Sequence, residues 1–500
     1  MASVSSTKKV ANKGLVKTLE IKTSCSYQTE DGRLIDKILD GIANCTIETS
    51  EKVGDFLQFA GKVSLTSVFV DNEKQLGSER VETNFTEKVQ IGDVDTTAII
   101  PTITAVKQRR ETSSFVDCTI TISIEIFGVM QETIAYVEAG NQNLVEKSKE
   151  IEAEGLLCFN NSTFTLTEEL DTSDHIDRII ANYSALAVNK IVPNGNYVTI
   201  EGEINRDIVY LSEGNLKKLQ KRNDFVQEVA LLNCSDDTTV SSKVYLASES
   251  VSLDVSDDGA KSILSFNANI SASIWGFEKS KFNVLEDVYS TEKELEVHHS
   301  SFTNISHLPV MIANESFSEN IDMSDKKRID EIVAIGSTLV SLESANLDGV
   351  NLGIVGVINQ KVIAKNYDND DIFSTELQIP FSLQVHTSME DENFNFTPTV
   401  VARCVNARNK AGKELSLSYE FSIMSDIVQS SVESYISECV ELSDKTPSKH
   451  SIVIYMPEKN EKVFDIAKKL SVTPEVMLAQ NPGISDNEPI QKVTLFKCVK

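Results

Sequence analysis

The sequence has 500 residues, more than one hydrophobic core accommodates, so we expect several domains. Its 41% hydrophobic and 24% charged residues are typical of a soluble globular protein and argue against extended disorder. The formal net charge of -28 argues against a nucleic-acid-binding protein and against docking on bare anionic lipid, because both need a basic surface.

The N-terminal segment and the cysteines bear on cellular location. MASVSSTKKVANKGLVKTLE contains lysines but lacks the apolar stretch of a signal peptide, and no apolar run in the chain is long enough to span a membrane. We therefore expect a protein that is neither secreted nor membrane-spanning. The eight cysteines are scattered and form no Cys-x-x-Cys pair, which predicts free thiols in a reducing cytosol.

The chain carries three copies of one pattern. The tetrapeptides IDKI, IDRI and IDEI place aspartates at Asp36, Asp177 and Asp330. A glycine inside an apolar stretch follows each aspartate after 25, 25 and 26 residues, at Gly61, Gly202 and Gly356. A phenylalanine follows each glycine after 24, 23 and 25 residues, at Phe85, Phe225 and Phe381.

Each copy closes with a long alternation of apolar and polar residues, which starts at Ile120, Leu264 or Leu415. Because side chains of a strand point alternately to its two faces, each segment predicts a strand with one buried face. Four landmarks in one register indicate a triplication. We expect a mainly β protein with three tandem β-sandwich or barrel-like repeats, at residues 12–150, 151–300 and 301–440. Polar connectors are expected at 142–155, 297–307 and 441–450.

The shared landmarks have plain structural interpretations. The stretch around each IDxI motif, such as DRIIANYSALAV, is compatible with a helix or a strand. A carboxylate at the start of a helix caps it, so we interpret Asp36, Asp177 and Asp330 as helix caps. We interpret the glycines as marks of β-bulges or close strand crossings, and the single tryptophan, Trp275, as a half-buried core residue.

The sequence contains no recognisable catalytic motif. P-loop, Rossmann, GxSxG and HExxH patterns are all missing. His298, His299 and His307 cluster in one expected connector, but no cysteine or second histidine pair is spaced to complete a zinc site. We therefore predict a non-enzymatic protein with no catalytic residue, no metal and no cofactor.

The tail has a different pattern. Apolar residues at i, i+3, i+4 and i+7 predict a first short helix with an inward face of Val463, Ile466, Ala467 and Leu470. Thr473 is predicted to cap a second helix, with Pro474 at its first position and its end near Gln480. An apolar segment at 452–456 and an alternating segment at 492–497 predict flanking strands. The expected order is strand, helix, helix, strand.

This tail, at residues 451–498, resembles the LysM domain. VFDIAKKL, TPEVMLAQ and the following Asn481-Pro482 match the two helices of that family and its usual stop. Where the family usually has Gly-Asp-Thr, this chain has Asn460-Glu461-Lys462. In sugar-binding members that loop and the loop after the second helix form the N-acetylglucosamine groove. The replaced glycine therefore argues against glycan binding.

A candidate partner-binding surface lies off the inward face of the first helix. Phe464 and Lys468 are four residues apart and share a side of the helix. An aromatic ring beside a cation is a common interface anchor, although Phe464 packing inside the module is the alternative. With the two adjacent loops, the predicted site comprises Asn460, Glu461, Lys462, Phe464, Lys468, Pro482, Gly483 and Ile484.

The three repeats resemble the SPOCS domain of sporulation proteins. The second repeat is the most similar, with its IDRI start, the strand VTIEGE at 198–203 and the ending Asp287-Val-Tyr-Ser290. Three such units followed by one LysM domain resemble the layout of SipL-like spore coat morphogenetic proteins.

This resemblance implies a structural adaptor in the cytoplasm of the mother cell, at the outer surface of the forespore. There the adaptor tethers the basement layer of the spore coat, and its LysM domain binds a SpoIVA-type ATPase, with other coat proteins as further candidate partners. The alternative function is recognition of peptidoglycan or other N-acetylglucosamine polymers.

Overall fold

The structure is a computed structural model that describes residues 5–29, 32–140, 144–255, 262–369, 371–389, 393–410, 413–446, 453–485, 490 and 494–496. It is mainly β, built from long antiparallel strands and two short helices within these residues. The first unit holds β1 (Ser5–Gln28), β2 (Ile35–Val53), β3 (Phe56–Asp71), β4 (Leu76–Gln90), β5 (Thr96–Arg110) and β6 (Phe115–Val137).

Two further groups of strands follow, which we call the second and third units. The second holds β7 (Val145–Thr172), β8 (Arg178–Asn194), β9 (Tyr197–Ser212), β10 (Asn215–Ala230), β11 (Thr239–Val255) and β12 (Ser262–Tyr289). The third holds β13 (Lys293–Asp322), β14 (Ile329–Asp348), β15 (Asn351–Asn366), β16 (Ile372–His386), β17 (Phe394–Lys410) and β18 (Glu414–Asp444).

The same strand order occurs in each unit. In the first unit one three-stranded sheet has the order β1-β6-β5 and the other has β2-β3-β4. The second unit pairs β11-β12-β7 and β10-β9-β8, and the third pairs β13-β18-β17 and β14-β15-β16. In every unit the first and the last strand therefore pair with each other, and the second, third and fourth strands form a meander.

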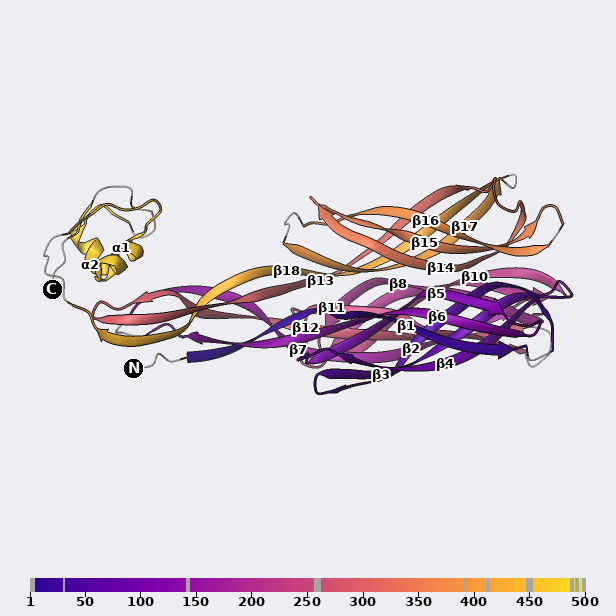
Figure 1. The fold of residues 1–500 in the computed structure, drawn as a ribbon, viewed down its shortest axis with the longest axis horizontal. Coiled ribbons are helices and arrows are strands. Elements are labelled where there is room, and N and C mark those ends of the chain that lie inside the picture. The colour runs from indigo at the N-terminus through magenta and orange to yellow at the C-terminus, as the bar shows by residue number, and fades with distance from the viewer. Residues whose placement is uncertain are drawn as a thin grey trace.

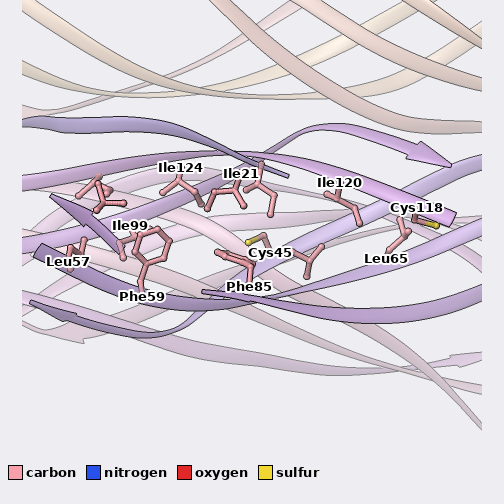
Figure 2. Close-up of a cluster of buried hydrophobic side chains, with 14 of the residues drawn as sticks. Ile21, Cys45, Leu57, Phe59, Leu65, Phe85, Ile99, Cys118, Ile120 and Ile124 are labelled. Carbon is pink, nitrogen blue, oxygen red and sulfur yellow. The ribbon is translucent and has the colours of Figure 1, made fainter. Parts of the chain in front are cut away.

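Each unit buries an apolar layer between its two sheets. In the first unit, Ile120 and Ile124 of β6 are fully buried, as their alternation predicted. Figure 2 shows them with Ile21 on one side of this layer and Phe59 of β3 on the other. The corresponding alternating segments of β12 and β18 supply the buried faces of the second and third units.

The segments around the three IDxI motifs are strands, and the interpretation of their aspartates as helix caps was wrong. Pairing with β3, β9 and β15 satisfies the backbone hydrogen-bonding groups of these segments. This pairing selects the strand over the helix. Asp36 Oδ2 accepts a hydrogen bond from Lys74 Nζ at 2.8 Å. Asp177 Oδ2 accepts one from the backbone N–H of Gly214 at 3.1 Å. Both carboxylates thus fasten the start of the second strand of a unit to the turn between its third and fourth strands.

The expected connectors are largely strand. Most of 142–155 lies in β7, all of 297–307 lies in β13, and β18 extends into 441–450 as far as Asp444. Polar side chains alternate along these strands and occupy their solvent-exposed face. The polar composition of these segments was therefore not evidence for a loop.

The ends of the outermost strands from all three units form a narrow stem. Its core contains residues of each unit, namely Val10, Ile134, Tyr136, Ile151, Phe282, Phe302 and Tyr435. Figure 1 shows β7, β12, β13 and β18 extending along this stem toward the C-terminal tail. The stem therefore joins the three units, and it lies between the tail and the wider part of these units.

Trp275 is fully buried between the first and second units, not half-buried as expected. Its Nε1 donates a hydrogen bond to Thr96 Oγ1 at 3.1 Å, and Lys13 Nζ lies 4.2 Å from its ring centroid. Lys13 Nζ also forms a 2.9 Å ion pair with Asp426 Oδ2 of the third unit. Lys243 of the second unit joins the same carboxylate at 3.1 Å. This buried cluster links strands from all three units.

The tail holds β19 (Val453–Tyr455), α1 (Val463–Leu470), α2 (Pro474–Gln480) and β20 (Thr494–Phe496), and its two strands pair antiparallel. The predicted positions of both helices are confirmed. Of the two predicted strands, the one at 452–456 ends at Tyr455, and residues 452, 492, 493 and 497 lie outside the described residues.

Candidate partner-binding site

Local sequence signals define the two helices of the tail. In α1, Val463, Ile466 and Ala467 are fully buried, as the helical period predicted. Thr473 Oγ1 accepts a hydrogen bond from the N–H of Val476 at 3.3 Å and so caps α2. These signals are all within a few residues of one another, which explains why the sequence predicts them well.

Four of the predicted site residues are exposed on the loops of the tail. Asn460 and Lys462 precede α1, and Pro482 and Gly483 follow α2. Asn460 has a left-handed backbone with φ of 70°. Asparagine tolerates this conformation better than most residues, so the loop keeps a turn that usually favours glycine. Ile484 is half-buried and packs against the core of the tail.

Glu461 is buried, so its assignment to a partner-binding surface was wrong. Its carboxylate accepts hydrogen bonds from Tyr455 Oη at 3.0 Å and from the backbone N–H of Glu458 at 2.6 Å. Lys469 Nζ lies 2.5 Å from the same carboxylate. Burial acts to raise the pKa of Glu461, but these hydrogen bonds, with that from Lys469 the largest, lower it overall. Glu461 therefore supports the loop from within.

Phe464 and Lys468 lie together, as predicted, but they face the stem. The ring of Phe464 packs edge-on against Tyr289, with centroids 5.3 Å apart. Lys468 Nζ forms a 2.5 Å ion pair with Asp287 Oδ1. Both partners lie at the end of β12, in the segment Asp287-Val-Tyr-Ser290. Within this chain the two residues fasten the tail to the second unit.

Further polar contacts reinforce this junction. Tyr289 Oη donates a 2.6 Å hydrogen bond to the carbonyl of Val472, and burial raises the pKa of Tyr289. Lys445 Nζ donates to the carbonyl of Ser290 at 2.9 Å and to Ser471 Oγ at 3.0 Å. Residues from the second unit, from the linker and from the tail thus share one set of contacts, which we call the tail dock.

A cleft of about 780 Å³ lies beside the tail dock. The tail contributes Lys462, Phe464, Thr473, Pro474 and Glu475 to it, and the stem contributes residues 144–147, 290–293 and 441. The tail and the stem therefore form one composite surface at this end of the molecule.

Sequence reasoning missed Tyr289 and Asp287 as functional positions. Both were noted only as part of a family-like ending, and no local pattern reveals that a strand end more than 170 residues upstream of α1 would receive the tail. The one available signal was a polar-tipped aromatic residue, Tyr289, downstream of the apolar alternation at 264–274.

The clustered histidines do not converge on one point. His307 is buried and stacks on Phe277, with ring centroids 3.8 Å apart. Its Nδ1 lies 2.7 Å from Glu154 Oε2. His298 and His299 are exposed on β13. Among the described residues, no group of three His, Cys, Asp or Glu side chains is arranged to hold a metal ion.

Comparison with known proteins gives no relative for this chain. No protein-family model, no curated protein and no solved structure matches it. Within the described part of the chain, the structure contains no helix with the length and apolar character needed to cross a membrane.

Proposed function

We propose that this protein is a non-enzymatic structural adaptor in endospore formation. Three β repeats form its scaffold, and a LysM domain at residues 451–498 forms its docking head. It acts in the cytoplasm of the mother cell, where it tethers the basement layer of the spore coat to the outer forespore surface. Its partner there is a SpoIVA-type ATPase, bound through the tail.

The tail dock is the observation that carries this proposal. It fixes a small domain at the tip of a long stem, through the contacts of Tyr289 and Asp287 with α1 and its neighbours. Asn460, Lys462 and Pro482 stay exposed on the tail, and Lys462 also lines the composite cleft. A head held at the end of a stem, away from the broad part of the molecule, is a suitable geometry for linking two layers. The recurring strand order of the three units supports a repeated scaffold.

Glycan binding is the second candidate function. The left-handed backbone of Asn460 keeps a turn that a glycine, the usual residue of the LysM family near this point, would also allow. Against this, the exposed side chains of Asn460 and Lys462 add bulk and charge to the loop that forms the groove in sugar-binding members of the LysM family. If the tail recognises glycan, we therefore expect the chain to bind peptidoglycan, with an affinity that these two side chains lower.

A pull-down with the full chain separates the two functions. Immobilised SpoIVA-type ATPase and insoluble peptidoglycan are each incubated with the wild type, with Lys462→Glu and with Lys17→Glu. Lys17 is an exposed lysine of β1, far from the tail in the sequence, so it is a control for the change of charge. The adaptor function predicts retention on the ATPase that Lys462→Glu weakens and Lys17→Glu preserves. Retention on peptidoglycan alone would favour the glycan function.

A further inference from the structure

Two thiols meet in the second unit, between β7 and the loop that leads from β10 to β11. Cys158 Sγ lies 3.5 Å from Cys234 Sγ, and both cysteines are free. Cys158 is half-buried, whereas Cys234 is buried. The two cysteines are 76 positions apart in the sequence, so only the packing of the second unit brings them together.

Hydrogen bonds hold the backbone on both sides of this contact. In the loop, the N–H of Cys234 donates to the carbonyl of Leu231 at 3.3 Å. Two residues after Cys158, the side-chain amide of Asn160 donates to the carbonyl of Ala230, at the end of β10, at 2.5 Å. Strands β7 and β10 are edge strands of the two different sheets. The thiols therefore meet where one edge of the sandwich is held by side chains.

Gly276 of β12 provides the space for the two sulfur atoms. It lies directly across from Cys158 on the neighbouring strand. A Cβ on Gly276 would lie 2.6 Å from Cys158 Sγ and 3.3 Å from Cys234 Sγ. Both sulfur atoms thus pack over one glycine, and this common surface keeps them side by side.

The first unit has the same arrangement without sulfur. Gly128 follows the closing alternation of β6 as Gly276 follows that of β12. A Cβ on Gly128 would meet the side chains of Val94 and Val16. Val94 is buried and Val16 is half-buried, in the same way as the two cysteines of the second unit. Two valines fill this position in the first unit, so packing by itself does not require a pair of thiols.

We propose that Cys158 and Cys234 form a reversible redox site, which a small peroxide converts into a disulfide. Cys158 is the more accessible thiol, and its thiolate attacks one oxygen of hydrogen peroxide. This step gives a sulfenic acid at Cys158 and releases one water. The thiol of Cys234 then attacks the sulfenic sulfur, the S–S bond forms, and the oxygen leaves as a second water. Overall, the two thiols lose two hydrogen atoms and the peroxide is reduced to two waters.

The disulfide fastens β7 covalently to the loop after β10. It closes the chain between Cys158 and Cys234 into a ring, which restricts the unfolded chain and so stabilises the second unit. Burial raises the pKa of Cys158 to about 12, so the first step is slow. Under reducing conditions the pair remains as two thiols. This inference does not depend on the proposed function.

Peptide mapping of the full chain after treatment with hydrogen peroxide tests the proposal. Cys25 and Cys118 lie directly opposite each other on β1 and β6, so the Cys25→Ser variant is used to remove that pair. After alkylation of the remaining thiols, we expect a peptide with Cys158 linked to Cys234, which dithiothreitol separates. If both cysteines remain alkylated at every peroxide dose below the one that oxidises methionine, the proposal is overturned. Disulfides between other cysteines alone would overturn it too.

Valine variants based on the first unit separate thiol chemistry from packing. In the Cys25→Ser chain, peroxide should raise the urea midpoint, and dithiothreitol should reverse the rise. Adding Cys158→Val and Cys234→Val should keep the fold and abolish this response. Cys234→Val alone should accumulate sulfenic acid at Cys158, which dimedone labels. An equal rise of the midpoint in the chain with both valines, or no oxidation of Cys158 in the single variant, would refute the assignment. The peptide mapping needs no valine variant.

Discussion

Phe225 lies directly across from Gly202 on the neighbouring strand, and its ring covers that glycine. A Cβ on Gly202 would lie 2.8 Å from Phe225 Cζ and 2.6 Å from the carbonyl oxygen of Ala187. The same cross-strand pair recurs in the other units, as Gly61 with Phe85 and Gly356 with Phe381.

The strand on the other side of each glycine carries a bulge at the same level. The register shifts between Val188 and Lys190, and Val188 is the residue opposite Gly202. Shifts at the equivalent level occur in β2 and β14. The interpretation of the shared glycines as bulges or close strand crossings is therefore confirmed. The shared glycine and the shared phenylalanine, which are more than twenty residues apart in the sequence, therefore form one cross-strand packing pair.

Gly202→Ala is expected to destabilise the protein. The added methyl group would clash with backbone as well as with the ring, so we expect a loss of roughly 1–3 kcal/mol, as for other overpacked sites. Urea denaturation followed by circular dichroism measures it. Gly155→Ala is the matched control in the same unit, because nothing lies within 4 Å of a Cβ there. An equal effect of the two substitutions would contradict the role of the pair.

Charge reversal tests the tail dock. Lys468→Glu places a carboxylate against Asp287 and should loosen the tail by about 1 kcal/mol, which is roughly a fivefold rise in local opening. Hydrogen exchange of α1 and α2 in the full chain measures it. The double variant Lys468→Glu with Asp287→Lys restores opposite charges and should restore protection. Failure of the double variant to recover would mean that this ion pair does not hold the tail.

Phe464→Ala and Lys468→Glu are also predicted to weaken binding to the coat-layer ATPase while the tail stays folded. The tail dock makes it possible to distinguish two reasons for weaker binding. If the partner requires a docked tail, the charge-swapped double variant should regain binding together with exchange protection. If Lys468 contacts the partner directly, the double variant should regain protection but not binding. A binding titration with both variants gives the answer.

The buried cluster of Lys13 predicts a pH dependence of stability. Burial lowers the pKa of Lys13 to about 8, below its ordinary value, although Asp426 acts to raise it. The unfolded chain therefore binds more protons than the folded chain between that pKa and the ordinary value, and stability from this site rises as pH rises through this window. Relative to Lys13→Met, the wild type should gain about 3 kcal/mol across it. Urea denaturation from pH 7 to pH 10.5 measures the gain, and a constant difference would contradict it.

The thiols are expected to be free and slow to react. Burial raises the pKa of Cys45, Cys158 and Cys404 to about 12, which suppresses their thiolates. Cys158 Sγ lies 3.5 Å from Cys234 Sγ, although both cysteines are free. Cys498 lies outside the described residues. Alkylation in denaturant after rapid trapping from cells should count eight thiols by mass spectrometry. Loss of tagged thiols in pairs would show a disulfide.

Local patterns in the sequence determined the β class, the buried faces of the closing strands and the limits of α1 and α2. Alternation and helical period depend only on the geometry of one element, so Ile120 in β6 and Val463 in α1 could be placed without knowing their neighbours. The capping of α2 by Thr473 is equally local.

Only the tertiary structure decided which contacts these elements make and which side chains they bury. The IDxI segments suit a helix or a strand, and pairing with the following strand selects the strand. Phe464 and Lys468 were correctly grouped, but only the position of β12 turns them toward Tyr289 and Asp287. The same holds for the complete burial of Trp275 against another unit. The contacts of Phe464, Lys468 and Trp275 join residues more than a hundred positions apart, and their energy depends on how whole units pack, which no local pattern records.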